Sequence, residues 1–250
     1  MRTRLAVTWA LPVAMSLLAL SSAGQTIPRM PGGKPNFNGV WAGPAFAHNV
    51  GPNDTDTPVV TNFDPRRMSP LLPGAEAKFR QAPTGDVRHD DPTELCLPDG
   101  HPREALAPYA QQIVQTPDTV VFLYEYMHFF RVIPMNQAHP ADVDPTFMGD
   151  SVAKWDGDTL VIDTIGLREW TLAASSQWHS DALHTVERLR YIDRTTLSYE
   201  IAIDDPKLFS KPWSQEFQMK LHPTWKLLEQ VCEENNRCQT GNCSPSSPQK

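Results

Sequence analysis

The pattern of apolar and polar positions changes near residue 110. From Gln111 onward, short runs of β-branched and aromatic residues are separated by turn signals, beginning with residues 113–116 and the turn at Pro117-Asp118. The next run, residues 119–134 (TVVFLYEYMHFFRVIP), is the densest in strand-forming side chains. Such residues favour strands, and no long stretch shows the 3.6-residue period of an amphipathic helix. This part of the chain is therefore predicted to be β-sheet.

Further strands are predicted at residues 183–192, 196–203, 213–221 and 226–232, with short turns between them. Trp155 and Thr159 flank Asp156-Gly157, which is a strong signal for a tight β-hairpin. Closely spaced strands with short turns predict an antiparallel meander. A sheet of this kind usually closes into a barrel or splits into a sandwich. The prediction is an all-β domain at residues 111–235, and the pattern alone leaves the barrel and the sandwich open.

Proline sets the character of the preceding segment. Fifteen of the 24 prolines fall between Pro28 and Pro117, and this density forbids long helices and central strands. Residues 24–110 are therefore predicted to wrap around the barrel, with the first barrel strand near residues 39–43. One short helix is expected at residues 72–81, where Pro73 fits a first helical turn, and the whole chain is expected to hold at most two short helices.

The two ends of the chain are predicted to lie outside the fold. Residues 1–23 combine Arg2 and Arg4 with an apolar stretch and a small-residue end at Ala23, which is typical of a secretory signal peptide. A membrane anchor is the alternative, but the stretch is short for a span. We therefore expect a secreted or periplasmic protein with no stable membrane insertion after cleavage. Residues 236–250 are expected to be a disordered or disulfide-tied tail.

Charge and cysteine content narrow the partners and the compartment. The net charge is −7 and no basic cluster is present, so nucleic acid is a poor partner. An even number of cysteines in an oxidising compartment favours disulfides. The most economical pairing is Cys96–Cys232, which closes a loop of about 136 residues, with Cys238–Cys243. A metal site at the last three cysteines is the alternative, but their spacing matches no standard zinc pattern.

Two motifs carry a resemblance to known proteins. Asn38-Gly39-Val40-Trp41 is similar to the N-terminal signature of lipocalin-like barrels, in which the tryptophan closes one end of the barrel. The block at residues 155–164, with Cys96-Leu97-Pro98, Asp204-Asp205-Pro206 and Lys211-Pro212-Trp213, resembles a group of uncharacterised secreted bacterial proteins over residues 36–235. This resemblance implies a lipocalin-like barrel. It implies no activity and no catalytic residues.

Histidines at the end of a long loop are the first candidates for chemistry. His179 and His184 lie at or just before the start of a strand, at the end of the loop at residues 166–181. This loop also carries Trp170 and Trp178, and long loops in compact domains often bind ligands. Histidine exchanges protons near neutral pH, and a carboxylate such as Glu187 or Asp163 would orient it. Ordinary loop hydrogen bonding is the simpler alternative. A metal site at His179, His184 and Glu187 is a third reading, but no recognised zinc spacing supports it.

Ionisable groups within the predicted strands are the second set. Read as one strand, residues 119–134 place Glu125 and Arg131 on one face and Tyr124 on the other. If some of these groups face the barrel interior, each buried charge requires a partner. Candidate pairs join Arg131 or Arg188 to Glu125, Asp163 or Glu200. Solvated outer faces with one structural ion pair are the alternative.

These candidates define two competing functions. In the first, the barrel is a cofactor-independent enzyme for hydrolysis, elimination or isomerisation of a small cyclic organic molecule. The catalytic candidates are His184, His179, Glu125, Asp163 and Glu187, and the substrate-binding candidates are Arg131, Arg188, Tyr124, Trp170, Trp178 and Glu200. In the second, the barrel is a binding or carrier protein for a small molecule. No metal or other cofactor is predicted, and the sequence does not indicate an oligomeric state.

Overall fold

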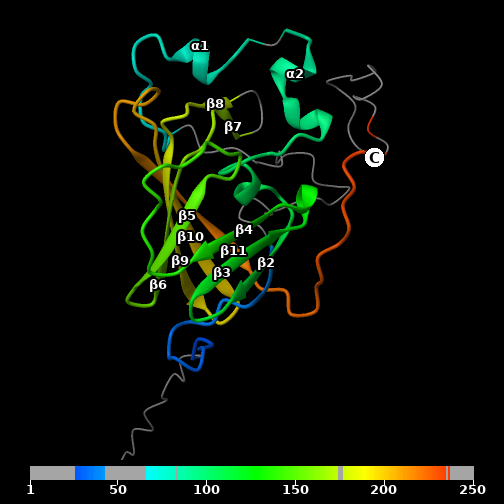
Figure 1. Cartoon of the computed structure of the whole chain (residues 1–250). Helices are drawn as coiled ribbons and strands as arrows, with labels where there is room; N and C mark the ends of the chain where they lie inside the picture. The colour runs from blue at the N-terminus through cyan, green and yellow to red at the C-terminus, as the bar shows by residue number, and fades with distance from the viewer. Residues whose placement is uncertain (1–25, 43–65, 83, 174–176, 235, 237–250) are drawn as a thin grey trace, which may run out of the picture.

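The computed structural model consists of two main antiparallel sheets that face each other (Figure 1). The structure describes residues 26–42, 66–82, 84–173, 177–234 and 236. The predicted signal peptide and the Cys238–Cys243 pair lie outside these residues. Within them, antiparallel strands dominate, so the predicted β-rich fold is confirmed.

The first sheet has the order β1-β2-β3-β4. Its strands are β1 (Gly39–Ala42), β2 (Ala110–Gln115), β3 (Thr119–Tyr124) and β4 (Phe130–Pro134). The prediction of one run at residues 119–134 was wrong about its path, because the chain reverses at the 3₁₀ turn η3 (Tyr126–His128). Met127 and His128 have positive φ angles there. The reversal places Arg131 beside Phe122 and separates it from Glu125.

The second sheet has the order β11-β10-β9-β6-β5. Its strands are β5 (Asp150–Asp156), β6 (Thr159–Ile165), β9 (His184–Asp193), β10 (Thr196–Asp204) and β11 (Trp213–Lys220). The predicted hairpin forms β5 and β6. Asp156 pairs with Thr159, so the turn residues are Gly157 and Asp158 and not the predicted Asp156-Gly157. Gly157 supplies the positive φ of +60° that a tight hairpin turn requires.

The segment predicted as an open loop at residues 166–181 holds a small hairpin. It contains β7 (Trp170–Ala173) and β8 (Gln177–His179), which pair with each other. The strand predicted at residues 226–232 is absent, because this described segment runs without strand pairing along η3. There Leu228 N–H donates to Glu125 and Met127 N–H donates to the Gln230 side chain.

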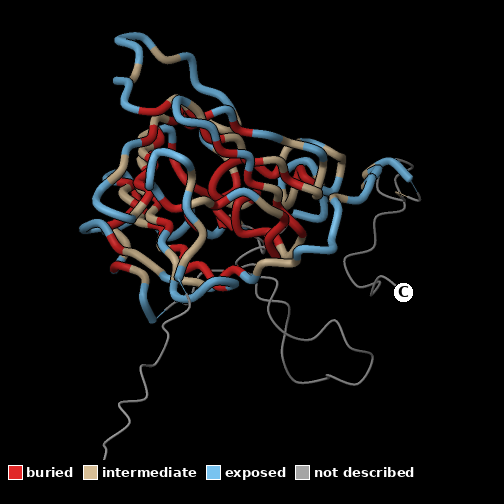
Figure 2. The backbone as a smooth tube through the Cα atoms, turned by 90° about the horizontal axis from the view of Figure 1, so that it is seen from below, coloured by how far each residue is buried: buried red, intermediate tan, exposed pale blue. Residues whose placement is uncertain are grey.

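The two sheets meet at both edges through isolated bridges. Trp41 of β1 pairs with Leu221, just after β11, and Met135, just after β4, pairs with Ala153 of β5. Neither sheet is closed on itself within the described residues, so these bridges join two sheets and do not form a continuous ladder. The core lies between the sheets, and Figure 2 shows the buried residues gathered in the middle of the molecule. Trp41, Phe122 and Tyr199 are among its largest fully buried side chains.

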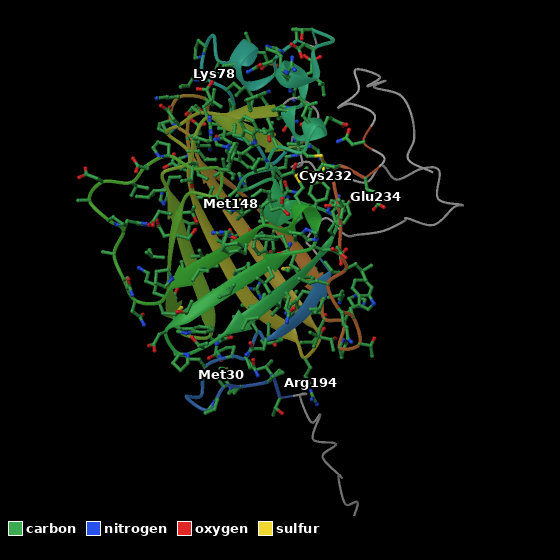
Figure 3. The ribbon with its side chains drawn as sticks, turned by 45° about the vertical axis from the view of Figure 1, so that its right-hand side comes forward. Met30, Lys78, Met148, Arg194, Cys232 and Glu234 are labelled. Atoms are coloured by element: carbon green, nitrogen blue, oxygen red, sulfur yellow. A yellow bond between two sulfur atoms is a disulfide. The ribbon has the colours of Figure 1, made fainter. Side chains whose placement is uncertain are left out.

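The proline-rich segment reaches both ends of the sheets, as the positions of Met30 and Lys78 show in Figure 3. Its helices are short: α1 (Glu76–Phe79), within the predicted range, α2 (Val87–Asp90), and the 3₁₀ turns η1 (Pro92–Leu95) and η2 (Glu104–Leu106). At the opposite end, Arg29 binds Asp158 and Lys34 donates to the Gly157 carbonyl, which fixes this segment to the β5–β6 turn.

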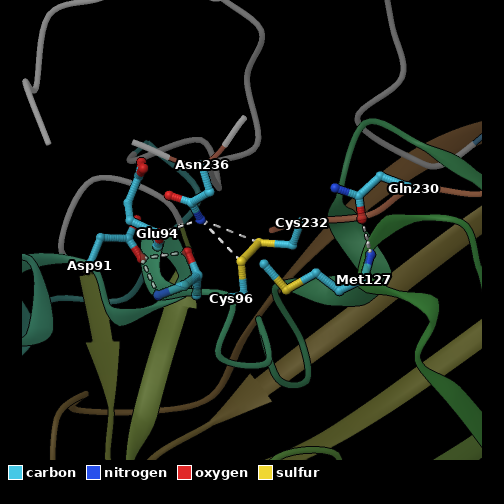
Figure 4. Close-up of a disulfide and its surroundings, with 8 residues drawn as sticks. Asp91, Glu94, Cys96, Met127, Gln230, Cys232 and Asn236 are labelled. Atoms are coloured by element: carbon cyan, nitrogen blue, oxygen red, sulfur yellow. Dashed lines mark hydrogen bonds between the residues drawn. A yellow bond between two sulfur atoms is a disulfide. The ribbon is translucent and has the colours of Figure 1, made fainter. Parts of the chain in front are cut away.

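The predicted Cys96–Cys232 disulfide is confirmed. It joins the wrapping segment to the segment that follows β11, with the two Cα atoms 5.6 Å apart (Figure 4). The Asn236 amide donates to the Glu94 carbonyl and to the Cys96 sulfur beside it. None of the helices in the described ranges has the length and apolar character that a bilayer span requires.

Candidate functional site

Alternation along β9 separates the charged residues of the second sheet into two groups. Glu187 is fully buried between the sheets, whereas Arg188 next to it is on the outer face. The same alternation on β6 turns Thr164 inward and leaves Asp163 on the outer face. The sequence candidates therefore belong to two separate clusters, one on each side of the sheet.

The inner cluster is built on the ion pair between Arg131 and Glu187. Arg131 Nη1 lies 3.0 Å from Glu187 Oε1 and Arg131 Nη2 lies 2.6 Å from Glu187 Oε2, which is the bidentate geometry of a strong pair. Tyr199 donates its hydroxyl proton to Glu187 Oε1 over 2.6 Å. Burial has the largest single effect and raises the pKa of Glu187, but nearby positive charge, chiefly that of Arg131, together with the hydrogen bonds from Arg131 and Tyr199 outweighs it and lowers this pKa to about 2.

Neighbouring polar groups complete the inner cluster. Arg131 Nη2 also donates to the hydroxyls of Ser151 and Thr164, each 2.9 Å away. His101 Nε2 lies 2.9 Å from the Thr185 hydroxyl and 3.8 Å from Glu187, and burial lowers the pKa of His101 to about 3. The partner of Arg131 is thus Glu187, and the pairings predicted with Glu125, Asp163 or Glu200 were wrong. These interior groups bind one another and hold the two sheets together.

A cleft of about 840 Å³ lies on the outer face of β5, β6 and β9. The segment after β4 forms its wall, where Asn136 N–H donates to the Ala153 carbonyl over 2.7 Å. The residues that line the cleft are Asn136, Gln137, His139, Val152, Ala153, Lys154, Trp155, Asp156, Val161, Asp163, Val186 and Arg188. Its floor therefore combines valines with charged groups from three neighbouring strands.

A chain of histidines and carboxylates borders this cleft. His139 Nδ1 lies 2.5 Å from Asp150 Oδ1, and His139 Nε2 lies 2.9 Å from Asp163 Oδ1. The other oxygen of Asp163 lies 3.1 Å from His184 Nε2. Partial burial would lower the pKa of His139, but hydrogen bonds to the two carboxylates raise it above its ordinary value. His139 therefore favours its charged form and holds Asp163 in place.

The contact with Asp163 fixes the role of each ring nitrogen in His184. An ionised carboxylate only accepts hydrogen bonds, so His184 Nε2 donates its proton to Asp163 Oδ2. Neutral His184 then carries its lone pair on Nδ1, and the ring is a little over one-third exposed. A histidine oriented in this way by a carboxylate is equipped to take a proton from a bound molecule.

The structure does not bring the remaining candidates to this chain of histidines and carboxylates. His179 is the last residue of β8 and is buried. Its Nδ1 donates to the Ser180 carbonyl, and its Nε2 has no hydrogen-bond partner among the described residues. Trp170 and Trp178 pack edge-to-face, 5.8 Å apart, within the same hairpin. Glu125 binds the segment after β11. Tyr124 belongs to the inner cluster, and Glu200 lies on the outer face opposite Arg188.

Sequence reasoning missed His139, Asp150 and Lys154. The register of the β5–β6 hairpin could have located Asp150 and Lys154. The tight turn after Asp156 pairs Asp150 with Ile165 and Lys154 with Val161. His139 lies in an irregular segment and no periodicity places it. The described residues contain no group of three or more histidine, cysteine, aspartate or glutamate side chains arranged to hold a metal ion.

Because His179 is buried, we expect the free energy of unfolding to fall in acid. Burial lowers the pKa of His179 from 6.5 to about 4, so its contribution is fully present above pH 6.5 and is lost as the pH falls towards 4. We expect the free energy of unfolding to fall by about 3 kcal/mol over this window from His179 alone. Urea titrations between pH 7 and pH 4 measure this fall.

The H179Q variant isolates this contribution. Burial raises the pKa of Asp99 to about 6, so Asp99 acts in the opposite direction and its contribution is lost as the pH rises from about 4 to 6. Asp99 is common to both proteins, so it cancels in the difference between wild type and H179Q. The variant should show a flatter dependence on pH, and exposed H89Q serves as the control. An equal slope in H179Q and wild type would contradict the assignment.

Comparison with known proteins adds no relative. No family model, no curated protein and no solved structure matches the chain. The functional conclusion therefore depends on the geometry of the cleft and its histidine–carboxylate chain.

Proposed function

We propose that this protein is an enzyme that performs cofactor-independent acid–base chemistry on a small organic molecule held in the outer cleft. The observation that carries the proposal is the contact between His184 Nε2 and Asp163 Oδ2, at the border of a cleft of about 840 Å³. Clefts of this size accommodate small molecules. An oriented histidine beside a cleft is a common arrangement for proton transfer.

In the proposed mechanism, His184 Nδ1 takes a proton from the substrate or from a water that attacks it. The imidazolium that forms is stabilised by the Asp163 carboxylate, and His184 then returns the proton to a leaving or rearranged group. Asp163 is a positioning residue, and His139 with Asp150 keeps its carboxylate turned towards His184. Hydrolysis, elimination and isomerisation all use such a proton transfer, which contributes about 10²- to 10⁴-fold to a rate.

A binding protein without catalysis is the second candidate. Its support is that His184 is not among the cleft-lining residues, whereas valines and Trp155 form much of the lining. In this case the cleft holds its ligand by apolar contact, and the charged groups provide specificity. The chain of histidines and carboxylates would then only fix the wall of the cleft to its floor.

The proposal includes a secreted or periplasmic location and a lipocalin-like closed barrel. The Cys96–Cys232 disulfide supports the location, because disulfides persist in oxidising compartments. The two bridges between sheet edges, at Leu221 and Met135, support closure of the strands into one barrel. Membership of the uncharacterised secreted group described above remains part of the same proposal.

Turnover is the test of the proposed function. The mature protein, residues 24–250, is incubated with a complex metabolite extract, and masses are followed by liquid chromatography over time. We expect one compound to be consumed in large molar excess over protein while a new mass appears. In H184A the rate should fall by about 10²- to 10⁴-fold, with a melting temperature within a few degrees of wild type.

The control is H89A, because His89 is an exposed histidine of α2 on the wrapping segment. This variant should keep the wild-type rate. Turnover of H184A at the wild-type rate would remove His184 from the mechanism. A compound depleted only to one equivalent, and recovered unchanged after denaturation, would establish the binding protein instead.

A further inference from the structure

The floor of the outer cleft is ordered in rows that cross three strands. Lys154 of β5 pairs with Val161 of β6, which pairs in turn with Arg188 of β9. The next row consists of Val152, Asp163 and Val186 in the same strand order. Rows two residues apart along a strand are separated by about 7 Å. The floor thus has a cationic row beside a row in which valines flank the positioning carboxylate.

One charge in this floor has no partner. Arg188 Nη2 lies 2.6 Å from Asp156 Oδ2, so Asp156 neutralises much of the Arg188 charge. Asp163 faces His139 and His184. No carboxylate in the described part of the chain pairs with Lys154, whose side chain is exposed at the cleft. Within the lining, Lys154 is therefore the cation available to a ligand.

From this arrangement we infer that the cleft selects organic anions with an apolar body. The anionic group binds Lys154, with Arg188 beside it, and the apolar body covers the valines of the two rows. The reacting group then points towards Asp163 and His184. This inference deepens the proposed function and rests on it for the direction in which the substrate lies.

The spacing of the rows sets the size of the ligand. His184 is four residues from Arg188 on the outer face of β9, which corresponds to about 13 Å along the strand. The side chains reach into this space, so the distance between the charged or reactive end groups is shorter than the distance along the strand. A body of one aromatic ring with a short acidic side chain fits such a gap.

Binding of matched probes tests the inference. The probes are 3-phenylpropionate, the neutral 3-phenylpropionamide and the cationic 3-phenylpropylamine, which share one apolar body and differ in charge. Backbone amide shifts of the ¹⁵N-labelled protein locate each probe and give its Kd. We expect the anion to shift the amides of β5, β6 and β9, and to bind about fivefold more tightly than the amide, as one exposed charge pair allows. The amine should bind weakest.

Two charge-reversal variants provide the matched comparison. K154E should abolish the preference for the anion, whereas K211E, at an exposed lysine before β11, should keep it. Equal affinity for all three probes, shifts on another surface, or an unchanged preference in K154E would overturn the inference.

The H184A variant distinguishes a failure of the anion inference from a failure of the proposed enzyme function. His184 moves the proton and does not hold the anion, so H184A should bind 3-phenylpropionate with the wild-type Kd. Anion binding in a protein without turnover supports the inference and rejects the enzyme. Turnover of a neutral compound, with no preference among the probes, supports the enzyme and rejects the inference.

Discussion

Replacing Arg131 with methionine should lower the free energy of unfolding by about 3–5 kcal/mol. The substitution leaves Glu187 as a fully buried carboxylate without its cation, and the hydrogen bond from Tyr199 cannot replace that charge. The hydroxyls of Ser151 and Thr164 lose a donor as well. Because whole domains are stable by about 5–15 kcal/mol, this is a large fraction of the total. Urea denaturation followed by tryptophan fluorescence measures the change.

Arg188, which follows Glu187 on β9, supplies a matched control. R188M removes the same type of side chain from a pair with Asp156 that is exposed to solvent, and we expect a loss below about 1 kcal/mol. The double variant R131M/E187L should recover part of the loss, because it removes both buried charges. It also keeps the prediction measurable if R131M fails to fold. Equal effects of R131M and R188M would show that the buried pair does not hold the sheets together.

Removing the Cys96–Cys232 disulfide should cost up to about 5 kcal/mol. The crosslink joins residues 136 positions apart, and in the chain-entropy model a loop of this length restricts the unfolded chain strongly. The variant is C96A/C232A, and its unfolding by urea is compared with that of the oxidised wild type. Strain in the native state or residual structure in the reduced, unfolded chain reduces this contribution, so the expected value is an upper bound.

Reduction of the wild type tests the same contribution by a second route. Dithiothreitol should lower the wild-type free energy of unfolding to that of C96A/C232A and change the variant itself very little. A wild type that keeps its stability after complete reduction of this bond would contradict the entropic role of the crosslink.

Local signals predicted the second sheet well. Gly157 specified the β5–β6 hairpin because glycine supplies the positive φ of a tight turn, although the turn is Gly157-Asp158, one residue later than predicted. Alternation along β9 places Glu187 and Arg188 on opposite faces, and this separation was not predicted. The partner of Arg131 was beyond sequence reasoning, because it comes from the opposite sheet and depends on how the two sheets face each other.

The first sheet shows where local pattern fails. Residues 119–134 read as one strand because strand-forming side chains continue across Tyr124-Glu125-Tyr126, with no glycine or proline to mark the reversal. The turn instead uses Met127 and His128 with positive φ, which sequence preference disfavours. At the candidate site, Asp163 and His184 were identified beforehand, whereas His139 reaches Asp163 from an irregular segment that follows β4.

Strand β9 carries both the interior ion pair and the cleft floor on alternate residues, with Glu187 facing one way and Arg188 the other. This interleaving constrains how the protein can evolve. Point substitutions at outward positions can retune the ligand while the core residues stay unchanged, so new specificities are accessible in single steps. Insertion or deletion of one residue in β9 would exchange the two faces, placing Arg188 among apolar side chains and Glu187 in solvent. Divergence of the cleft should therefore proceed by substitution within β9, with length changes confined to the turns at its ends.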